Sequence, residues 1–329
     1  MSSQCAAICG DVPSLSVVIP CFNEELCIDL AYRRLTEAAI QAVGDRYELI
    51  FVNDGSTDST LAILGALALS DPRVVVVDLS RNHGHQLALS AGLSLSRGQR
   101  IFIIDADLQD PPELLGRFMT ALDKGADVAY GHRRSRPSET WFKKLTAKLF
   151  YRVLSRQTDL AIPLDTGDFR LMSRRVLEVV LAMPEAHRFV RGMIAWAGFK
   201  QVPITYDRHE RHAGATKYPV RKMLLLALDA LTSFGTIPLR FLYFTSFLFV
   251  LISIVLIIWS VSEYFAYNVV PGWASLMVVY LTISSVQLLS LAFIGEYVGR
   301  IFEQTKNRPL FIIRNVIRHD LPGGPPRGT

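Results

Sequence analysis

The chain has 329 residues, of which 50% are apolar and 20% charged, and its mean hydropathy is +0.27. This composition excludes a disordered or fibrous protein and directs attention to membrane segments. The net charge of +5 is a modest basic excess, and we expect no nucleic-acid partner.

The cysteines all lie near the start of the chain and lack the paired spacing of a zinc site. We therefore expect reduced thiols at Cys5, Cys9, Cys21 and Cys27. The first dozen residues have no basic start and no long apolar run, so no signal peptide is expected.

Residues 13–130 alternate between short β-rich runs and helical stretches. The pattern predicts strands at 15–19, 47–52, 74–79 and 100–104, and helices near 27–42, 59–69 and 85–95. Such alternation predicts an α/β fold with a mostly parallel sheet and helices on both faces. Ligands of such sheets bind beyond the carboxyl ends of the strands, so we expect the functional residues directly after each strand.

Acidic and amide side chains follow three of these strands, in residues 21–25, 53–58 and 105–113. Asp105 and Asp107 come directly after an apolar strand, and the two-residue period of a strand directs both carboxylates the same way. Each would raise the pKa of the other unless a cation lay between them. We expect Mg²⁺ or Mn²⁺ here, although a plain helix-capping loop remains the alternative.

The turn at 53–58 has two interpretations. Asp-Gly and Ser-Thr-Asp are common in turns and helix caps. The functional interpretation is that Asp54 and Glu24 accept hydrogen bonds from the base and ribose of a nucleotide.

Residues 139–157 place Trp, Phe and Leu at helical spacing and fill the other positions with Lys and Arg. This pattern suits an interfacial helix at an anionic membrane surface; an ordinary helix packed on the sheet is the alternative. A second such stretch, 218–233, leads toward the first of two uncharged apolar runs, 241–262 and 269–295.

Each apolar run is long enough to cross a bilayer, whereas a buried hairpin would need a partner shell that the rest of the chain is too short to supply. The connection 263–272 carries no Lys or Arg, but both flanks do, so both ends are expected in the cytoplasm. We therefore expect a multi-pass protein of the inner (cytoplasmic) membrane with its catalytic region on the cytoplasmic side. The apolar helices also offer surfaces for self-association into a homo-oligomer.

Taken together, these motifs resemble the polyprenyl-phosphate glycosyltransferases of glycosyltransferase family 2, which include dolichyl-phosphate mannose synthases and bacterial undecaprenyl-phosphate glucosyltransferases. The resemblance runs from about residue 15 to about residue 318. The motifs that carry it are Ser16-Val-Val-Ile-Pro-Cys-Phe-Asn-Glu24, Val52-Asn-Asp-Gly-Ser-Thr-Asp58, Arg81-Asn-His-Gly-His-Gln86, Asp105-Ala-Asp-Leu-Gln-Asp-Pro-Pro112, Thr166-Gly-Asp-Phe-Arg-Leu171, Gly214-Ala-Thr-Lys-Tyr218, Gly295-Glu-Tyr-Val-Gly-Arg-Ile-Phe302 and Lys306-Asn-Arg-Pro309. Asn53 departs from the pattern, since many relatives carry Asp there.

The resemblance implies a GT-A (Rossmann-like) fold and assigns the site residues to four groups. The expected nucleotide-sugar ligands are Pro20, Phe22, Asn23, Glu24, Asp54, Gly84, Gln86, Asp105 and Ala106. The expected metal ligands are Asp105, Asp107 and Gln109. The expected catalytic residues are Asp107, Asp168 and Arg170, of which the segment 168–170 is expected near the reacting sugar. Asp168 is expected to be a base or an orienting group, with a structural carboxylate paired with Arg170 as the alternative. The residues expected to meet the acceptor phosphate are Arg133, Arg211 and Lys217.

The reaction implied is inverting transfer of a hexose from a nucleotide sugar to a polyprenyl phosphate. Glucose from UDP-glucose is preferred because residues 191–196 look closest to the bacterial glucosyl members; UDP-linked aminoarabinose, UDP-galactose and GDP-mannose remain open. A processive polysaccharide synthase would need more spans and a Gln-x-x-Arg-Trp motif, which the stretch 188–192 does not supply. A non-catalytic nucleotide-sugar-binding subunit is the remaining alternative.

The expected organisation has five parts. These are an N-terminal extension (1–12), a cytoplasmic catalytic domain (13–220), a juxtamembrane helix (221–236), a transmembrane hairpin (237–299) and a cytoplasmic tail (300–329).

Overall fold

The computed structural model describes residues 12–134, 167–186, 188–207 and 272–319, with scattered positions between 247 and 262. The chain divides into two compact units, one formed by 1–144, 160–216 and 308–329 and the other by 145–159 and 217–307. The expected interfacial helix 139–157, the juxtamembrane segment 221–236, Arg211 and Lys217 lie outside the described residues.

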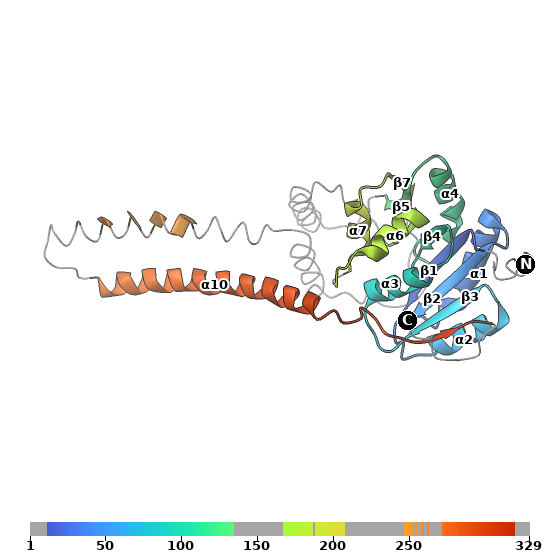
Figure 1. Cartoon of the computed structure of the whole chain (residues 1–329), viewed down its shortest axis with the longest axis horizontal. Helices are drawn as coiled ribbons and strands as arrows, with labels where there is room; N and C mark the ends of the chain where they lie inside the picture. Colours follow the sequence, from blue (N-terminus) through green and yellow to red (C-terminus); the bar gives the residue numbers. More distant parts are fainter. Residues whose placement is uncertain are drawn as a thin grey trace, which may run out of the picture. The chain divides into compact units, whose positions relative to one another are not determined.

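The first unit is built on an eight-stranded sheet in the order β7-β5-β6-β4-β1-β2-β3-β8 (Figure 1). Its strands are β1 (Leu15–Cys21), β2 (Tyr47–Asn53), β3 (Val74–Leu79), β4 (Arg100–Ile103), β5 (Val128–Arg133), β6 (Arg170–Ser173), β7 (Gln201–Tyr206) and β8 (Ile313–Ile317). The neighbours β3, β2, β1 and β4 are parallel, as the sequence predicts. This topology is that of a GT-A-like α/β fold.

The sheet is mixed but mostly parallel, as expected, since β5 and β7 also pair in parallel. Strand β6 runs antiparallel to β4 and β5, and β8 runs antiparallel to β3. Strand β8 lies in the segment expected to be a tail. It covers β3, a Val-rich strand buried along its length that would otherwise present an open edge.

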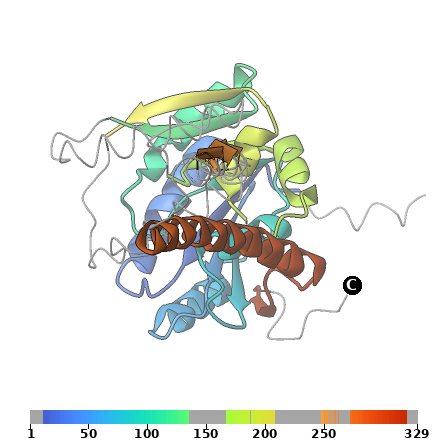
Figure 2. The same cartoon turned by 90° about the vertical axis from the view of Figure 1, so that its left-hand side faces the viewer.

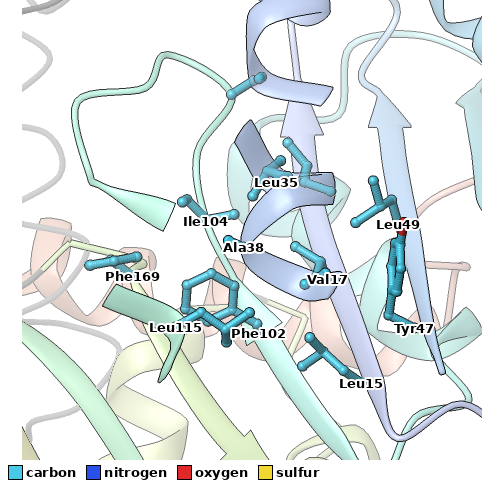
Figure 3. Close-up of a cluster of buried hydrophobic side chains, with 14 of the residues drawn as sticks. Leu15, Val17, Leu35, Ala38, Tyr47, Leu49, Phe102, Ile104, Leu115 and Phe169 are labelled. Carbon is cyan, nitrogen blue, oxygen red and sulfur yellow. The ribbon is translucent and has the colours of Figure 1, made fainter. Parts of the chain in front are cut away.

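Helices cover both faces of the sheet. They are α1 (Ile28–Val43), α2 (Thr60–Ser70), α3 (His85–Leu95), the 3₁₀ helix η1 (Pro112–Leu114), α4 (Leu115–Asp123), α6 (Arg174–Ala182) and α7 (Val190–Trp196). The two-residue period of β1 divides its side chains between two cores: Val17 packs in the core under α1, α2 and α4, and Val18 in the core under α3, α6 and α7. Figure 3 shows part of the first core, in which Leu35 of α1 lies over the sheet.

The second unit contains α10 (Trp273–Thr305), a continuous helix of 33 residues (Figures 1 and 2). Among the described residues, no helix is both long and apolar enough to cross a membrane. Most of the first apolar run, 241–262, is not described, so the hairpin at 237–299 stays a prediction.

Helix α3 approaches the sheet closely at Gly92. A Cβ atom there would lie 2.4 Å from Val18 Cγ1 and 2.8 Å from Val52 Cγ2. We expect Gly92→Ala to lower the free energy of unfolding by about 1–3 kcal/mol, because overpacking outweighs the gain in helix propensity. Gly116→Ala in α4, where nothing lies within 4 Å, is the matched control and should be neutral or stabilising in urea unfolding. Equal effects of the two substitutions would contradict this packing.

Candidate active site

The loops after β1 and β2 are hydrogen-bonded to each other. The N–H of Asn23 donates to Ser56 Oγ at 3.0 Å, and the N–H of Thr57 donates to Asn23 Oδ1 at 2.8 Å. The N–H of Glu24 donates to Thr60 Oγ1 at 2.9 Å. Phe22, Asn23 and Glu24 therefore belong to a loop connected to the next one at the carboxyl ends of two parallel strands, and Pro20 is buried in β1 just before it.

Asp54 organises the loop that leads into α3. Its two carboxylate oxygens accept hydrogen bonds from the N–H groups of His83 and Gly84, at 2.7 and 2.9 Å. Burial raises the pKa of Asp54, and these backbone hydrogen bonds oppose that rise. Gly55 has φ +66°, and a Cβ there would lie 2.6 Å from the backbone of Arg81. The turn at 53–56 therefore fixes the position of Gly84 as well as offering polar groups of its own.

Asp105 and Asp107 follow β4 directly. Asp105 Oδ1 is buried and accepts no hydrogen bond from the described residues. Burial raises the pKa of Asp105 to about 6, helped by the charges of Asp168, Asp107 and Asp110 and opposed by His85. Asp107 is buried, and its Oδ1 accepts the N–H of Gln109 at 3.2 Å.

A divalent cation fits this pair of carboxylates. No group of three or more His, Cys, Asp and Glu residues placed to hold a metal occurs among the described residues. Asp105, however, presents a buried oxygen without a donor in a setting crowded with negative charge. Oxygen ligands of this kind suit Mg²⁺ or Mn²⁺ when substrate phosphates supply further ligands.

Four polar side chains lie close to another buried carboxylate, that of Asp168. They are Gln86 Nε2 at 2.8 Å and His85 Nε2 at 3.1 Å, both from Oδ2, and Arg191 Nε at 3.4 Å and Arg170 Nη2 at 3.9 Å, both from Oδ1. Burial alone would raise the pKa of Asp168, but Arg191, His85 and Arg170 hold it well below its usual range. Asp168 is therefore an ionised carboxylate with little affinity for a proton.

His85 links Asp168 to Asp105. Its Nε2 lies 3.1 Å from Asp168 Oδ2 and 3.7 Å from Asp105 Oδ1. Burial would lower the pKa of His85, but the hydrogen bond to Asp168 and the charge of Asp105 raise it to about 9. A cationic imidazolium thus lies between the two carboxylates.

Sequence reasoning missed His85 and Arg191 as parts of this cluster. His85 lies within the Arg81–Gln86 motif and is the first residue of α3, directly after Gly84, and that position was the available signal. Arg191 lies in the stretches 188–192 and 191–196, which were compared only for acceptor and donor preference.

Arg133, expected to meet the acceptor phosphate, is engaged within the protein. Its Nε donates to Tyr206 Oη at 3.2 Å and its Nη2 to Asp110 Oδ2 at 3.5 Å, while Tyr206 Oη donates to Asp110 Oδ1. The guanidinium thus joins the ends of β5 and β7 to the loop that carries Asp107. Its side chain is 24% exposed, so part of it still faces solvent.

Comparison with known proteins places this site in a family. The model of "Glycosyl transferase family 2" matches residues 16–181, which span nearly all of β1 to α6. The chain belongs to glycosyl transferase family 2. The matched region includes Asp54, Asp105, Asp107 and Asp168, whereas Arg191 and Tyr206 lie outside it.

Relatives of this family 2 chain match it over most of its length. The uncharacterized glycosyltransferase YkcC of Bacillus subtilis is 46% identical over 306 residues, covering 91% of this chain and 93% of YkcC. The bactoprenol glucosyl transferase of Shigella phage SfX is 37% identical over 302 residues, covering 92% and 99%. Among solved structures, glucosyl-3-phosphoglycerate synthase of Mycobacterium tuberculosis, crystallised with Mn²⁺, UDP and glucosyl-3-phosphoglycerate, aligns with a TM-score of 0.45 and 20% identity, covering 67% of this chain and 77% of that one.

Proposed function

We propose that this family 2 glycosyltransferase transfers glucose from UDP-glucose to a polyprenyl phosphate, with inversion at the anomeric carbon. The observation that carries the proposal is the likeness to the phage SfX bactoprenol glucosyl transferase, which extends over 92% of this chain and 99% of that protein. A likeness of this extent includes the region after the catalytic sheet as well as the sheet itself.

The nucleotide sugar is proposed to lie over the carboxyl ends of β1, β2 and β4. The connected loops after β1 and β2 supply hydrogen-bonding groups at this edge, and the 84–86 segment begins α3 beside them. The residues proposed to contact the nucleotide sugar are Pro20, Phe22, Asn23, Glu24, Asp54, Gly84, Asp105 and Ala106.

Asp105 and Asp107, with Gln109 nearby, are proposed to hold Mg²⁺ or Mn²⁺. A divalent cation bound there would act as a Lewis acid toward the leaving nucleoside diphosphate, an effect worth several kcal/mol. The buried, donor-free Oδ1 of Asp105 is the observation that supports this assignment.

The attacking group is proposed to be a phosphate oxygen of the lipid. The second pKa of a phosphate monoester is near 6, so this oxygen is largely ionised at neutral pH and needs no strong base. The depressed pKa of Asp168 agrees with an orienting role rather than proton abstraction. Arg170, Arg191 and the His85 imidazolium place positive charge around Asp168, close to where two polyanionic substrates would meet.

The lipid acceptor requires the site to lie near a membrane surface. We propose that residues 237–299 form the membrane hairpin, with the catalytic unit and both termini on the cytoplasmic side of the inner membrane. Arg211 and Lys217 are proposed to meet the acceptor phosphate, with the exposed part of Arg133. The long apolar runs and the flanking basic residues support the placement of the hairpin and of both termini. Self-association stays a prediction.

The donor is tested by incubating membranes that contain the protein with radiolabelled nucleotide sugars and undecaprenyl phosphate. We expect label from UDP-glucose in the organic phase, and much less from UDP-galactose, UDP-aminoarabinose or GDP-mannose. Transfer from another donor alone would change the sugar but keep the reaction class. Failure of every donor would contradict the transferase proposal and favour a non-catalytic nucleotide-sugar-binding subunit.

A further inference from the structure

The side-chain amide of Gln86 makes a hydrogen bond within the protein at each of its two ends. Its Nε2 donates to Asp168 Oδ2 at 2.8 Å, and its Oε1 accepts the backbone N–H of Val190 at 2.9 Å. A carboxylate cannot donate and a backbone N–H cannot accept, so these partners fix the orientation of the amide. Gln86 therefore connects α3 both to the segment before β6 and to the first residue of α7.

The contact with Val190 also controls the other side of Asp168. The residue after Val190 is Arg191, whose Nε lies 3.4 Å from Asp168 Oδ1, the oxygen that Gln86 does not contact. Val190 is buried, so its backbone has no water to replace a lost acceptor. The Gln86 amide thus contacts Asp168 Oδ2 directly. It also holds the backbone of Val190, next to Arg191, whose guanidinium faces Asp168 Oδ1.

We propose that Gln86 is a positioning residue, which orients the Asp168 carboxylate and keeps the start of α7, and hence Arg191, against it. The inference rests on the proposed function, in which Asp168 lies near the reacting sugar. It goes beyond the expectation that Gln86 binds the nucleotide, since each end of the amide has a protein partner at short distance.

Three roles for Gln86 predict different kinetics. A nucleotide ligand would raise the KM for UDP-glucose when replaced. A residue that only supports the fold would lower stability and activity alike at every pH. A positioning residue lowers kcat with the donor KM nearly unchanged, and its effect depends on whether the replacement can still donate a hydrogen bond to Asp168.

Gln86→Glu separates these roles, because a protonated carboxyl can donate to Asp168 and accept from Val190 as the amide does, whereas an ionised one repels Asp168. The introduced carboxyl would face Asp168, and the charged groups next in this cluster are Asp105, His85, Arg170 and Arg191. The two carboxylates favour its protonated form, and the three cations oppose it. Gln86→Met removes both hydrogen bonds at every pH. Ser94→Ala is the control, since Ser94 lies on the same helix and its hydroxyl donates to the Ala91 carbonyl.

The experiment measures kcat and the UDP-glucose KM of the wild type and the three variants between about pH 5.5 and about pH 8.5. Relative to the wild type at each pH, Gln86→Glu should lose about 10- to 100-fold in kcat at the alkaline end and recover most of it at the acid end. Gln86→Met should be impaired throughout, and Ser94→Ala should match the wild type. A loss mainly in KM, or a Gln86→Glu deficit that does not change with pH, would overturn the proposal.

Thermal unfolding of the same proteins provides a readout that needs no substrate. The melting temperature of Gln86→Glu should approach that of the wild type as the pH falls, while that of Gln86→Met should not. Wild-type protein that transfers nothing from any donor would refute the proposed function. A pH-independent melting deficit of Gln86→Glu would refute the role of Gln86 separately, whatever the substrate.

Discussion

Replacing Asp107 by Asn is expected to lower kcat for glucose transfer by at least about 100-fold, because loss of a charged ligand removes much of the several kcal/mol that a Lewis-acid cation contributes. Asp107 is buried beside Asp105, and the substitution keeps its shape and its contact with the Gln109 N–H. The measurement is steady-state transfer to undecaprenyl phosphate at saturating Mg²⁺ or Mn²⁺.

Asp123→Asn is the matched control for this prediction. It makes the same chemical change at the end of α4, where Asp123 is 60% exposed and pairs with Arg100. Exposed ion pairs contribute about 0–1 kcal/mol, so activity and melting temperature should stay close to the wild type. Near-normal turnover by Asp107→Asn, with a fold that melts as the wild type does, would contradict the assignment of this carboxylate.

Replacing Asp168 by Asn is expected to damage both stability and activity. The carboxylate is 3% exposed and lies near three cationic groups, those of His85, Arg170 and Arg191. Removing one partner of a buried ionic cluster costs about 3–5 kcal/mol, because the remaining charges stay buried without compensation. Urea unfolding should show a loss of this size, and transfer should fall below detection.

The surface pair of Asp127 and Arg175 offers the comparison for Asp168. Arg175 is 68% exposed, and its Nη2 lies 2.7 Å from Asp127 Oδ1. Asp127→Asn should therefore change the free energy of unfolding by about 1 kcal/mol or less. If the two Asn variants unfold at the same urea concentration, the buried cluster contributes no more than a surface pair, and the account of Asp168 is wrong.

The parallel centre of the sheet could be predicted because its strands carry their own signal. Strands β1 to β3 contain apolar runs of three or four residues and are followed by turn-forming residues, and the structure places them within two residues of the expected bounds. Strand β8 has no such signal. Its five residues include Arg314 and Asn315, and they form a strand because β3 offers an edge more than 200 residues earlier in the chain.

The candidate site was predictable where residues lie directly after a strand. Asp105 and Asp107 follow β4, and Asp54 follows β2, so their common edge was a consequence of parallel pairing. The cluster around Asp168 was not accessible in this way. His85 and Asp168 are 83 positions apart. The antiparallel pairing of β6 with β4 places Asp168, which lies just before β6, close to His85.

Arg133 illustrates the opposite limit. The family resemblance implied a phosphate ligand, and the structure adds that its guanidinium contacts Asp110 and Tyr206, which is 73 positions away. Sequence composition counts charges but does not show which of them are already paired in the folded protein.

The most direct test of the central claim is metal dependence of glucose transfer by the purified protein. Transfer from UDP-glucose to undecaprenyl phosphate is measured after dialysis against EDTA, and again after Mg²⁺, Mn²⁺ or Ca²⁺ is added. We expect no transfer in EDTA, and recovery with Mg²⁺ or Mn²⁺ in the wild type but not in Asp107→Asn. Full-speed turnover in EDTA would show that no divalent cation takes part in the reaction.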